Sequence, residues 1–339
     1  MDKIDKAKGS LLAGAIGDAL GFEIELDSLE KIYQKYGEDG IQNYRLYDKE
    51  AIISDDTQLT LYTAEALIYN DDEINLLRDI HSHYLDWLKT QLKVLMPNNN
   101  FENPNISKIQ HIEGINDIRE PGMTCIYSLM NRKIGSMEKP LNDSKGCGGL
   151  MKNAPVGIYY GARSDKNILD IAEISAQIAA MTHGHPLAYI PVYCMTDIIV
   201  RIFREDRDLE EMIIDAIEDT DMRFCKSKYI DYFTDLSKKA IRLAKKTDNK
   251  DIDNIINLGQ GWVAEETLAI AIYSSIKYKN DIIKAIKTAV NHGGDSDSTG
   301  AVTGNILGVY LGEKSIPKEF IEPLENRYLI EEIAEKLII

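Results

Sequence analysis

Cysteine is scarce in this chain, with four residues among 339, and no two of them form a CxxC pair. Neither a disulfide framework nor a zinc site built on cysteine pairs is therefore expected. Long apolar runs are also missing. The stretch 187–200 is interrupted by Pro191 and Asp197, so its uninterrupted apolar length is well below the roughly 18–20 residues that cross a bilayer. The first six residues lack the apolar segment of a signal peptide. We expect a cytoplasmic protein with no membrane partner.

Positive charge is in deficit, since 39 Lys and Arg residues face 55 Asp and Glu residues, which gives a net charge of −16. Nucleic acids are bound mainly through clustered Lys and Arg side chains. The basic pairs at 238–239 and 245–246 lie in helical sequence flanked by aspartates, as on a solvated helix face. The composition argues against a nucleic-acid partner.

Alternating strand patterns are rare as well, and apolar residues instead recur with the helical period of 3.6. This period is clear in 72–92, 168–181 and 263–275. The apolar segment 187–203 fits a strand followed by a helix or one buried helix, and its length favours the helix. We predict an all-α fold.

No repeat, linker or compositional break divides the chain, so residues 1–339 are predicted to form a single domain. One segment differs from the rest: 96–122 is rich in Pro and Asn, which is typical of a long irregular loop. Loops of this length are often functional. A lid over a site and an inert surface excursion are both compatible with the sequence.

The segment 291–300, NHGGDSDSTG, combines two carboxylates and several hydroxyls near the expected start of a helix at Ser298. Asp295 and Asp297 can converge with hydroxyls on one hard cation. An EF-hand fails, because its twelfth position is Ile306. The segment also matches a phosphatase-type D-x-D-x-T motif, but that motif normally follows an apolar strand early in its domain, whereas this segment is late in the chain. It could also be a helix cap, although capping needs only one such residue.

A second acid-hydroxyl cluster, Ser54-Asp55-Asp56-Thr57, opens the amphipathic helix expected over 58–69. Ser54 suits the N-cap position, and acids in the first turn suit the helix dipole. Capping alone would explain this cluster. Its pairing with Asp295 and Asp297 suggests a shared, oxygen-lined metal site, although sequence alone leaves the convergence open.

Two glycine-rich segments also need an explanation. In the apolar run 9–21, each helical glycine costs about 1 kcal/mol relative to alanine, which indicates close backbone packing or space for a ligand. Asp18 lies inside this run and must find a partner if it is buried. The second segment, 144–151, is a turn entering a helix, where N–H groups can bind phosphate.

His183 and His185 could ligate a metal, but the oxygen donors elsewhere favour hydrogen bonding or stacking. Cys147 has no base at a fixed spacing, so we do not expect a cysteine nucleophile.

Taken in order, these segments resemble the ADP-ribosylglycohydrolase family, which includes dinitrogenase-reductase-activating and ADP-ribosyl-arginine hydrolases. The matching pieces extend over about residues 5–312 and are GDALG (17–21), SDDT (54–57), PGMT (121–124), GCGGLM (146–151), THGHP (182–186) and HGGDSDSTG (292–300).

The resemblance implies a single all-α domain with two Mg²⁺ ions in a binuclear centre. One ion would be held by Ser54, Asp55 and Asp56, and the second by Asp295 and Ser298, with Asp297 bridging them. Glu25 aligns with an acid that binds the second ion or activates water, and Glu23 is the competing choice. The implied catalytic set is Glu25, Asp55, Asp56 and Asp297.

The resemblance also assigns the ligand side of the site. Ser144, Lys145 and Gly146 match the loop that holds the diphosphate and ribose, and His183 matches a ligand-contacting histidine. The chain departs from the family at Cys147, where Asn is frequent, and at Lys152, where Arg is frequent.

The implied reaction is hydrolysis of the bond between the anomeric ribose carbon and an acceptor side chain, through an oxocarbenium-like transition state. The substrate would be an ADP-ribosylated protein and the product ADP-ribose. The DSDST version resembles the arginine-directed members. One alternative is a protein of the same fold that binds ADP-ribose or a toxin and acts by occlusion of another active site, without turnover. The other is a metal phosphohydrolase, which would release phosphate.

Overall fold

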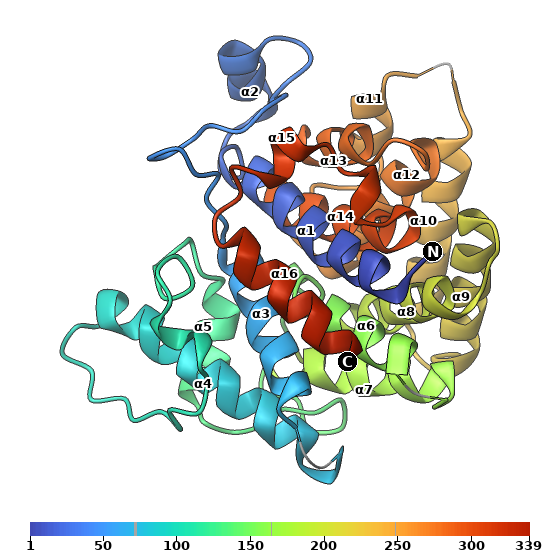
Figure 1. The fold of residues 1–339 in the computed structure, drawn as a ribbon. Coiled ribbons are helices and arrows are strands. Elements are labelled where there is room, and N and C mark those ends of the chain that lie inside the picture. The colour runs from blue at the N-terminus through green and yellow to red at the C-terminus, as the bar shows by residue number, and fades with distance from the viewer. Residues whose placement is uncertain (71–72, 164, 248) are drawn as a thin grey trace.

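A computed structural model describes residues 1–70, 73–163, 165–247 and 249–339. Over these residues the chain forms helices and turns, with isolated β-bridges but no β-strand. The predicted all-α fold is therefore confirmed, and the helices form a single domain (Figure 1).

The α-helices in the first half of the chain are α1 (Lys3–Phe22), α2 (Leu29–Tyr36), α3 (Asp55–Ile68), α4 (Leu76–Leu95), α5 (Met123–Met130), α6 (Ala154–Arg163) and α7 (Ile168–Ala180). Those in the second half are α8 (Pro186–Arg204), α9 (Leu209–Arg223), α10 (Ile230–Ala244), α11 (Asp251–Ile256), α12 (Ala264–Lys277), α13 (Ile282–Val290), α14 (Ser296–Leu311), α15 (Lys318–Ile321) and α16 (Arg327–Ile338). Four short 3₁₀ turns join them: η1 (Glu73–Asn75), η2 (Ile109–His111), η3 (Cys147–Gly149) and η4 (Glu313–Ser315).

The helices predicted over 168–181 and 187–203 correspond to α7 and α8 within a residue at each end. The helix predicted over 72–92 is η1 followed by α4, and residues 71–72 lie outside the described part of the chain. α8 is long and apolar enough to cross a membrane, but 89% of its most apolar 18-residue stretch is buried inside the fold. α8 is thus a core helix.

The centre of the fold is an antiparallel pair formed by α1 and α14, which lie side by side in Figure 1. Their backbones touch along a row of small residues. A methyl group added to Gly17 would lie 2.1 Å from the carbonyl oxygen of Gly300, and one added to Gly304 would lie 2.0 Å from that of Ala13. The glycines of segment 9–21 are therefore packing glycines. Their close approach brings the C-terminal end of α1 against the N-terminus of α14.

Segment 96–122 runs from the end of α4 to the start of α5 and is anchored by buried carboxylates. The Asp86 carboxylate of α4 accepts the backbone N–H groups of Asn105, Ile106 and Ser107 at 2.7, 2.7 and 2.8 Å. Near its end, the carbonyl oxygen of Arg119 accepts the N–H of the first residue of α3 at 3.3 Å. The segment is thereby fixed against α3 and α4 and reaches the region of the acid clusters.

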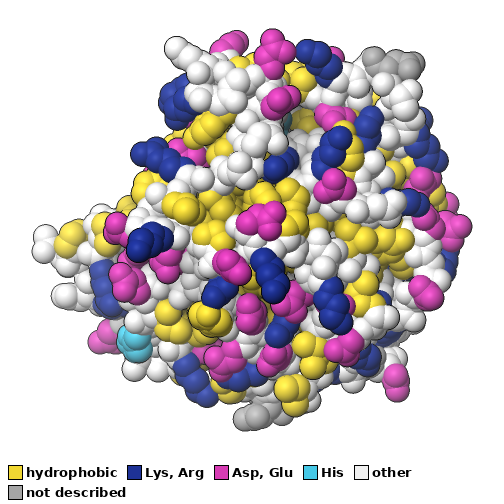
Figure 2. All heavy atoms as spheres, turned by 45° about the horizontal axis from the view of Figure 1, so that its top comes forward, with side chains coloured by type: hydrophobic (Ala, Val, Ile, Leu, Met, Phe, Trp, Pro, Cys, Tyr) yellow, Lys and Arg dark blue, Asp and Glu magenta, His cyan; other side chains and the backbone are white. Residues whose placement is uncertain are grey.

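On the face shown in Figure 2, Lys and Arg side chains alternate with Asp and Glu side chains. The described residues of this face form no continuous basic patch.

Candidate active site

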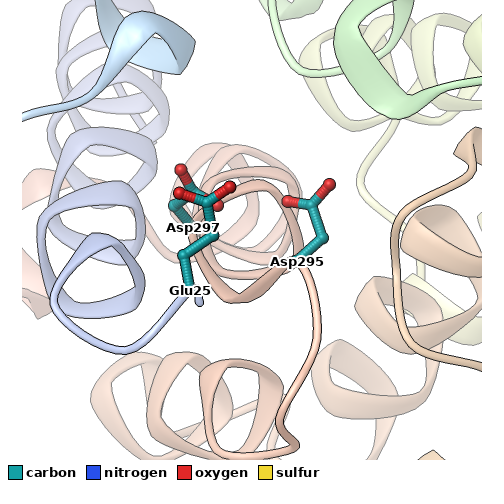
Figure 3. A group of neighbouring side chains, drawn as sticks. All are labelled: Glu25, Asp295 and Asp297. Atoms are coloured by element: carbon teal, nitrogen blue, oxygen red, sulfur yellow. The ribbon is translucent and has the colours of Figure 1, made fainter. Parts of the chain in front are cut away.

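Three helix ends meet at one place and bring the acid clusters together. The N-termini of α3 and α14 carry the two predicted clusters, and the turn that follows α1 carries Glu25. Carboxylate oxygens of Glu25, Asp295 and Asp297 lie within 4.8 Å of one another and point toward one another in Figure 3. This convergence is the property that the sequence alone left open.

Hydroxyl groups link the starts of α3 and α14. The Ser298 hydroxyl donates to the Asp56 carboxylate at 2.8 Å, and the Ser54 hydroxyl is hydrogen-bonded to Asp297. Asp295 caps α14 by accepting the N–H of Ser298 at 3.3 Å. The two clusters thus form one hydrogen-bonded group, to which both helix N-termini contribute.

α14 starts at Ser296, two residues before the predicted start near Ser298. α3 runs from Asp55 to Ile68, so the acids that follow Ser54 lie in its first turn, as predicted. Ser54 is the N-cap of α3, as predicted, and accepts the N–H of Asp56 at 3.2 Å.

Asp18 is the buried acid of α1, and its partners are at the start of α3. Its carboxylate accepts the N–H of Ser54 at 3.0 Å, the N–H of Thr57 at 3.1 Å, and the Thr57 hydroxyl. Burial, and then the charge of Asp297, raise its pKa to about 7. Asp18 thus satisfies free N–H groups of α3 and fixes this helix to α1.

The carboxyl groups of the site are buried close together, which makes their ionised forms costly. Burial and mutual repulsion raise the pKa values of Asp55, Asp56 and Asp295 far above the ordinary range, and they raise that of Glu25 to about 10. Burial also raises the pKa of Asp297. None of the ion pairs found among the described residues involves these five carboxylates. Such a group of acids needs a bound cation to ionise together.

The donor chemistry of the cluster fits a hard divalent cation. Its donors are carboxylate and hydroxyl oxygens, which suit Mg²⁺, and the Asp55 carboxylate is oriented by the N–H of Gly122 at 3.1 Å. One side chain of the chain itself adds positive charge nearby. Lys152 is fully buried, donates to the Thr182 hydroxyl at 3.0 Å, and lowers the pKa of Asp55.

The structure separates the two glutamates that follow α1. Glu23 accepts hydrogen bonds from the hydroxyls of Tyr47 at 2.8 Å and Tyr36 at 3.2 Å, and it pairs with Arg45 at 3.1 Å. Glu25 instead faces the aspartates of α14 (Figure 3). Glu25 is therefore the acid that belongs to the cluster.

The residues predicted for the ligand side lie in and beside the loop before η3. Ser144 bonds to the Thr124 hydroxyl at 3.2 Å, and the Lys145 ammonium pairs with the fully buried Glu265 of α12. His183 faces this loop, since a methyl added to Gly146 would lie 3.5 Å from its Nε2 atom. Burial and then Lys152 lower the pKa of His183 to about 3, so its ring is neutral.

This loop is held against the start of α12 and touches the acid cluster. The carbonyl oxygen of Lys145 accepts the N–H of Ala264 at 3.0 Å, and Gly146 forms a β-bridge with Val263. At its end, Cys147 donates to the Asp295 carboxylate at 2.7 Å. The predicted ligand loop and the predicted metal cluster are thus neighbours.

A cavity of about 280 Å³ opens beside Glu25. Its charged lining residues are Glu23, Glu25, Asp27, Lys35, Arg45 and Glu120. Glu120, at the end of segment 96–122, has a left-handed backbone with φ of 50°, a conformation that is uncommon for residues other than glycine. Glu120 is a single charge outside any motif and was not predicted as a site residue, and Lys152 was identified only as a departure from the Arg that is frequent in the family.

Comparisons with known proteins identify the family of this chain. The profile of the ADP-ribosylglycohydrolase family matches residues 1–339. The chain is 22% identical to the ADP-ribosylhydrolase ARH1 of Dictyostelium discoideum, in an alignment that covers 98% of this chain and 93% of that protein. It is 24% identical to the ADP-ribosyl-[dinitrogen reductase] glycohydrolase of Rhodospirillum rubrum, in an alignment that covers 95% of this chain and 91% of that protein.

A solved structure described as an ADP-ribosylglycohydrolase-related protein complex shares the fold, with a TM-score of 0.62 at 20% identity over 99% of this chain and 98% of that one. The family profile covers every segment on which the resemblance was based. The chain belongs to the ADP-ribosylglycohydrolase family and is an enzyme that hydrolyses ADP-ribose linkages.

Proposed function

We propose that this enzyme removes ADP-ribose from arginine side chains of modified proteins, with two Mg²⁺ ions at the junction of α1, α3 and α14. The observation that carries the proposal is the convergence of buried carboxylates from three separate segments. Five acids that repel one another so strongly are stable as ligands of cations, and a chain that only bound ADP-ribose by occlusion would not need them.

One ion would be held by Ser54, Asp55 and Asp56, and the second by Asp295 and Ser298, with Asp297 between them. When bound, the ions would supply positive charge that stabilises the ribose hydroxyls and the attacking water. The chain's own contribution is to fix the donors. The cross-links from Ser298 to Asp56 and from Ser54 to Asp297 hold the two helix starts together before any ligand arrives.

Glu25 is placed to handle the attacking water. It is half-buried, it contacts the aspartates of α14 on one side, and it lines the cavity on the other. Its raised pKa makes it a better proton acceptor, once ionised, than an ordinary carboxylate. Water attack on the anomeric carbon breaks the bond to the acceptor nitrogen, which leaves with the bonding electron pair as a neutral guanidine. Glu25 takes a proton of that water and returns it to the departing guanidine.

The loop 144–146 and His183 would hold the ADP-ribose portion next to this centre. The neutral ring of His183 can donate or accept a hydrogen bond, and the loop N–H groups can face the diphosphate. The Lys145 ammonium is already paired with Glu265, so its positive charge would be divided between that carboxylate and the diphosphate of the ligand.

The charge of the cavity favours a cationic acceptor. Arg45 neutralises Glu23, and Lys35 neutralises Asp27. Glu25 and Glu120 remain without a described ion pair, and Glu120 also raises the pKa of Glu25. A guanidinium group leaving from the ribose would compensate both carboxylates, whereas a serine hydroxyl would compensate neither.

The test is a panel of defined proteins ADP-ribosylated on arginine or on serine, assayed for free ADP-ribose with and without Mg²⁺. We expect Mg²⁺-dependent release that is faster from arginine. In Glu120→Gln, kcat/KM for the arginine substrate should fall by about tenfold, as for loss of one charge contact of about 1.4 kcal/mol. Glu102→Gln, an exposed acid of the same segment that does not line the cavity, is the matched control.

Three outcomes would contradict parts of this proposal. Binding of ADP-ribose without its release from any substrate would refute the hydrolase activity. Equal rates on serine and arginine substrates would refute the acceptor preference. Release of phosphate instead of ADP-ribose would indicate a phosphohydrolase.

We also propose a cytoplasmic location. The four cysteines are all free thiols, which agrees with a reducing compartment.

A further inference from the structure

A sulfur atom lies inside the otherwise oxygen-lined cluster. The Cys147 Sγ atom is 2.7 Å from an Asp295 carboxylate oxygen and 3.5 Å from the Ser298 hydroxyl. That hydroxyl also contacts Asp56 at 2.8 Å and the Met151 sulfur at 3.9 Å. One side of the acid cluster therefore presents two sulfur atoms from the same turn of the chain, next to proposed Mg²⁺ ligands.

We propose that Cys147 is a metal ligand that, with Asp295, binds thiophilic divalent cations such as Zn²⁺, Cd²⁺ and Co²⁺ in competition with Mg²⁺. The inference rests on the metal centre of the proposed function and adds to it a selectivity for the kind of ion. Thiolate prefers soft or borderline cations, whereas Mg²⁺ prefers oxygen donors alone. On binding, the thiol proton leaves to solvent and the sulfur lone pair forms the bond to the ion.

The positions of the two donors suit a shared ion. In a tetrahedral zinc site the sulfur lies at about 2.3 Å and a carboxylate oxygen at about 2.0–2.2 Å from the ion, so the two donors are about 3.5–3.7 Å apart. The observed separation of 2.7 Å needs to grow by about 1 Å. The carboxylate and the hydroxyl beyond it can supply further oxygen ligands.

The other cysteines make no such contact. Cys125 is buried beside Lys152, whose ammonium lies 3.7 Å from its sulfur, and Cys194 is fully buried in the core helix α8. Cys225 is exposed, beyond the end of α9. A sulfur–metal bond in this protein would therefore identify Cys147, and Cys225 provides a matched control thiol.

The first experiment titrates the metal-free full-length protein with Co²⁺ under anaerobic conditions and follows absorption and calorimetry together. We expect a near-ultraviolet thiolate-to-cobalt charge-transfer band that saturates with the binding heat. Cys147→Ser should lose this band while still binding Co²⁺, and Cys225→Ser should keep it. In competition with Mg²⁺, Cys147→Ser should weaken Cd²⁺ binding by about tenfold or more, with little change for Mg²⁺.

The second experiment needs no variant and so avoids any folding defect. Alkylation of the wild-type thiols, mapped by mass spectrometry, should be slowed at Cys147 by Cd²⁺ far more than by Mg²⁺, with no effect at Cys225. Co²⁺ binding without the band, or equal protection by both ions, would overturn the role of Cys147 and leave the Mg²⁺ centre intact. Failure of every ion to bind would overturn both.

Discussion

Mg²⁺ is expected to stabilise this protein more strongly at high pH than at low pH. Glu25 has its pKa raised from an ordinary value of 4.5 to about 10 by burial and by neighbouring acids. For an acid raised in this way, the stability that it contributes is complete below pH 4.5 and is lost as the pH rises toward 10. A bound cation favours the ionised form and removes this loss, so its stabilising effect must grow across this window.

The minimum size of the effect follows from one displaced proton, that of Glu25, and protons displaced from the neighbouring aspartates add to it. Each pH unit changes the free energy of ion binding by about 1.4 kcal/mol per proton released, which gives about 3 kcal/mol between about pH 6 and about pH 8. The unfolding entropy of 339 residues is about 0.7 kcal/mol/K. The increase in melting temperature caused by Mg²⁺ should therefore be at least about 4 °C larger at the higher pH.

Differential scanning calorimetry in chelator and in saturating Mg²⁺, at each pH, measures this difference directly. His183 and His292 have lowered pKa values because they are buried, but their effect is common to both conditions and cancels. Glu25→Gln should reduce the pH dependence, because one of the displaced protons is removed, whereas Glu23→Gln, two residues away and paired with Arg45, should keep it. A stabilisation by Mg²⁺ that is constant with pH, or larger at low pH, would refute the assignment of the acid cluster as the ion site.

Other perturbations have equally definite outcomes. Asp297→Ala should abolish turnover by removing the carboxylate between the two ions, and full activity at saturating Mg²⁺ would sink the assignment. A strong chelator should inhibit the enzyme and Mg²⁺ should restore it; recovery with Zn²⁺ alone would contradict the oxygen-ligand argument. Gly304→Ala places a methyl 2.0 Å from the carbonyl oxygen of Ala13 and should destabilise the fold by about 3 kcal/mol in denaturant titrations; an unchanged midpoint would show that the helices can separate. Lys145→Met should lower the free energy of unfolding by about 1–3 kcal/mol, and with it the melting temperature, because Glu265 stays buried without its partner. Adding Glu265→Gln should restore most of the lost stability.

The helices were the part of the fold that the sequence could predict. Apolar residues at a spacing of 3.6 define α7 almost to the residue, because burial of one face sets both the pattern and the helix. The length of the apolar segment 187–203 is what indicated α8. The start of α14 was less predictable. Asp295 caps this helix, but the hydroxyls and acids that follow it fit a helical first turn as well as a preceding loop.

The arrangement of the site depended on contacts that no local pattern encodes. Glu23 and Glu25 are equivalent by motif, and only the positions of Arg45 and of the α14 aspartates distinguish them. The carboxylate of Glu120 was missed, and the place of the buried Lys152 ammonium beside the site was not predicted, for the same reason. Their roles arise from distant segments that fold beside the acids.

The pairing of α1 with α14 has a consequence for the synthesis of this protein. Ser10 of α1 donates to the carbonyl oxygen of Asn305, 295 residues further along the chain. At about 5–20 residues per second, the ribosome needs about 15–60 s to produce the partner of α1 after α1 itself has emerged. During that time the glycine-rich face of α1 lacks the helix against which it packs, although α3 and α6, which also contact α1, have already been made, and apolar surface exposed in this way favours aggregation. The active site, which lies at the end of this same helix pair, is therefore one of the last parts of the enzyme to form.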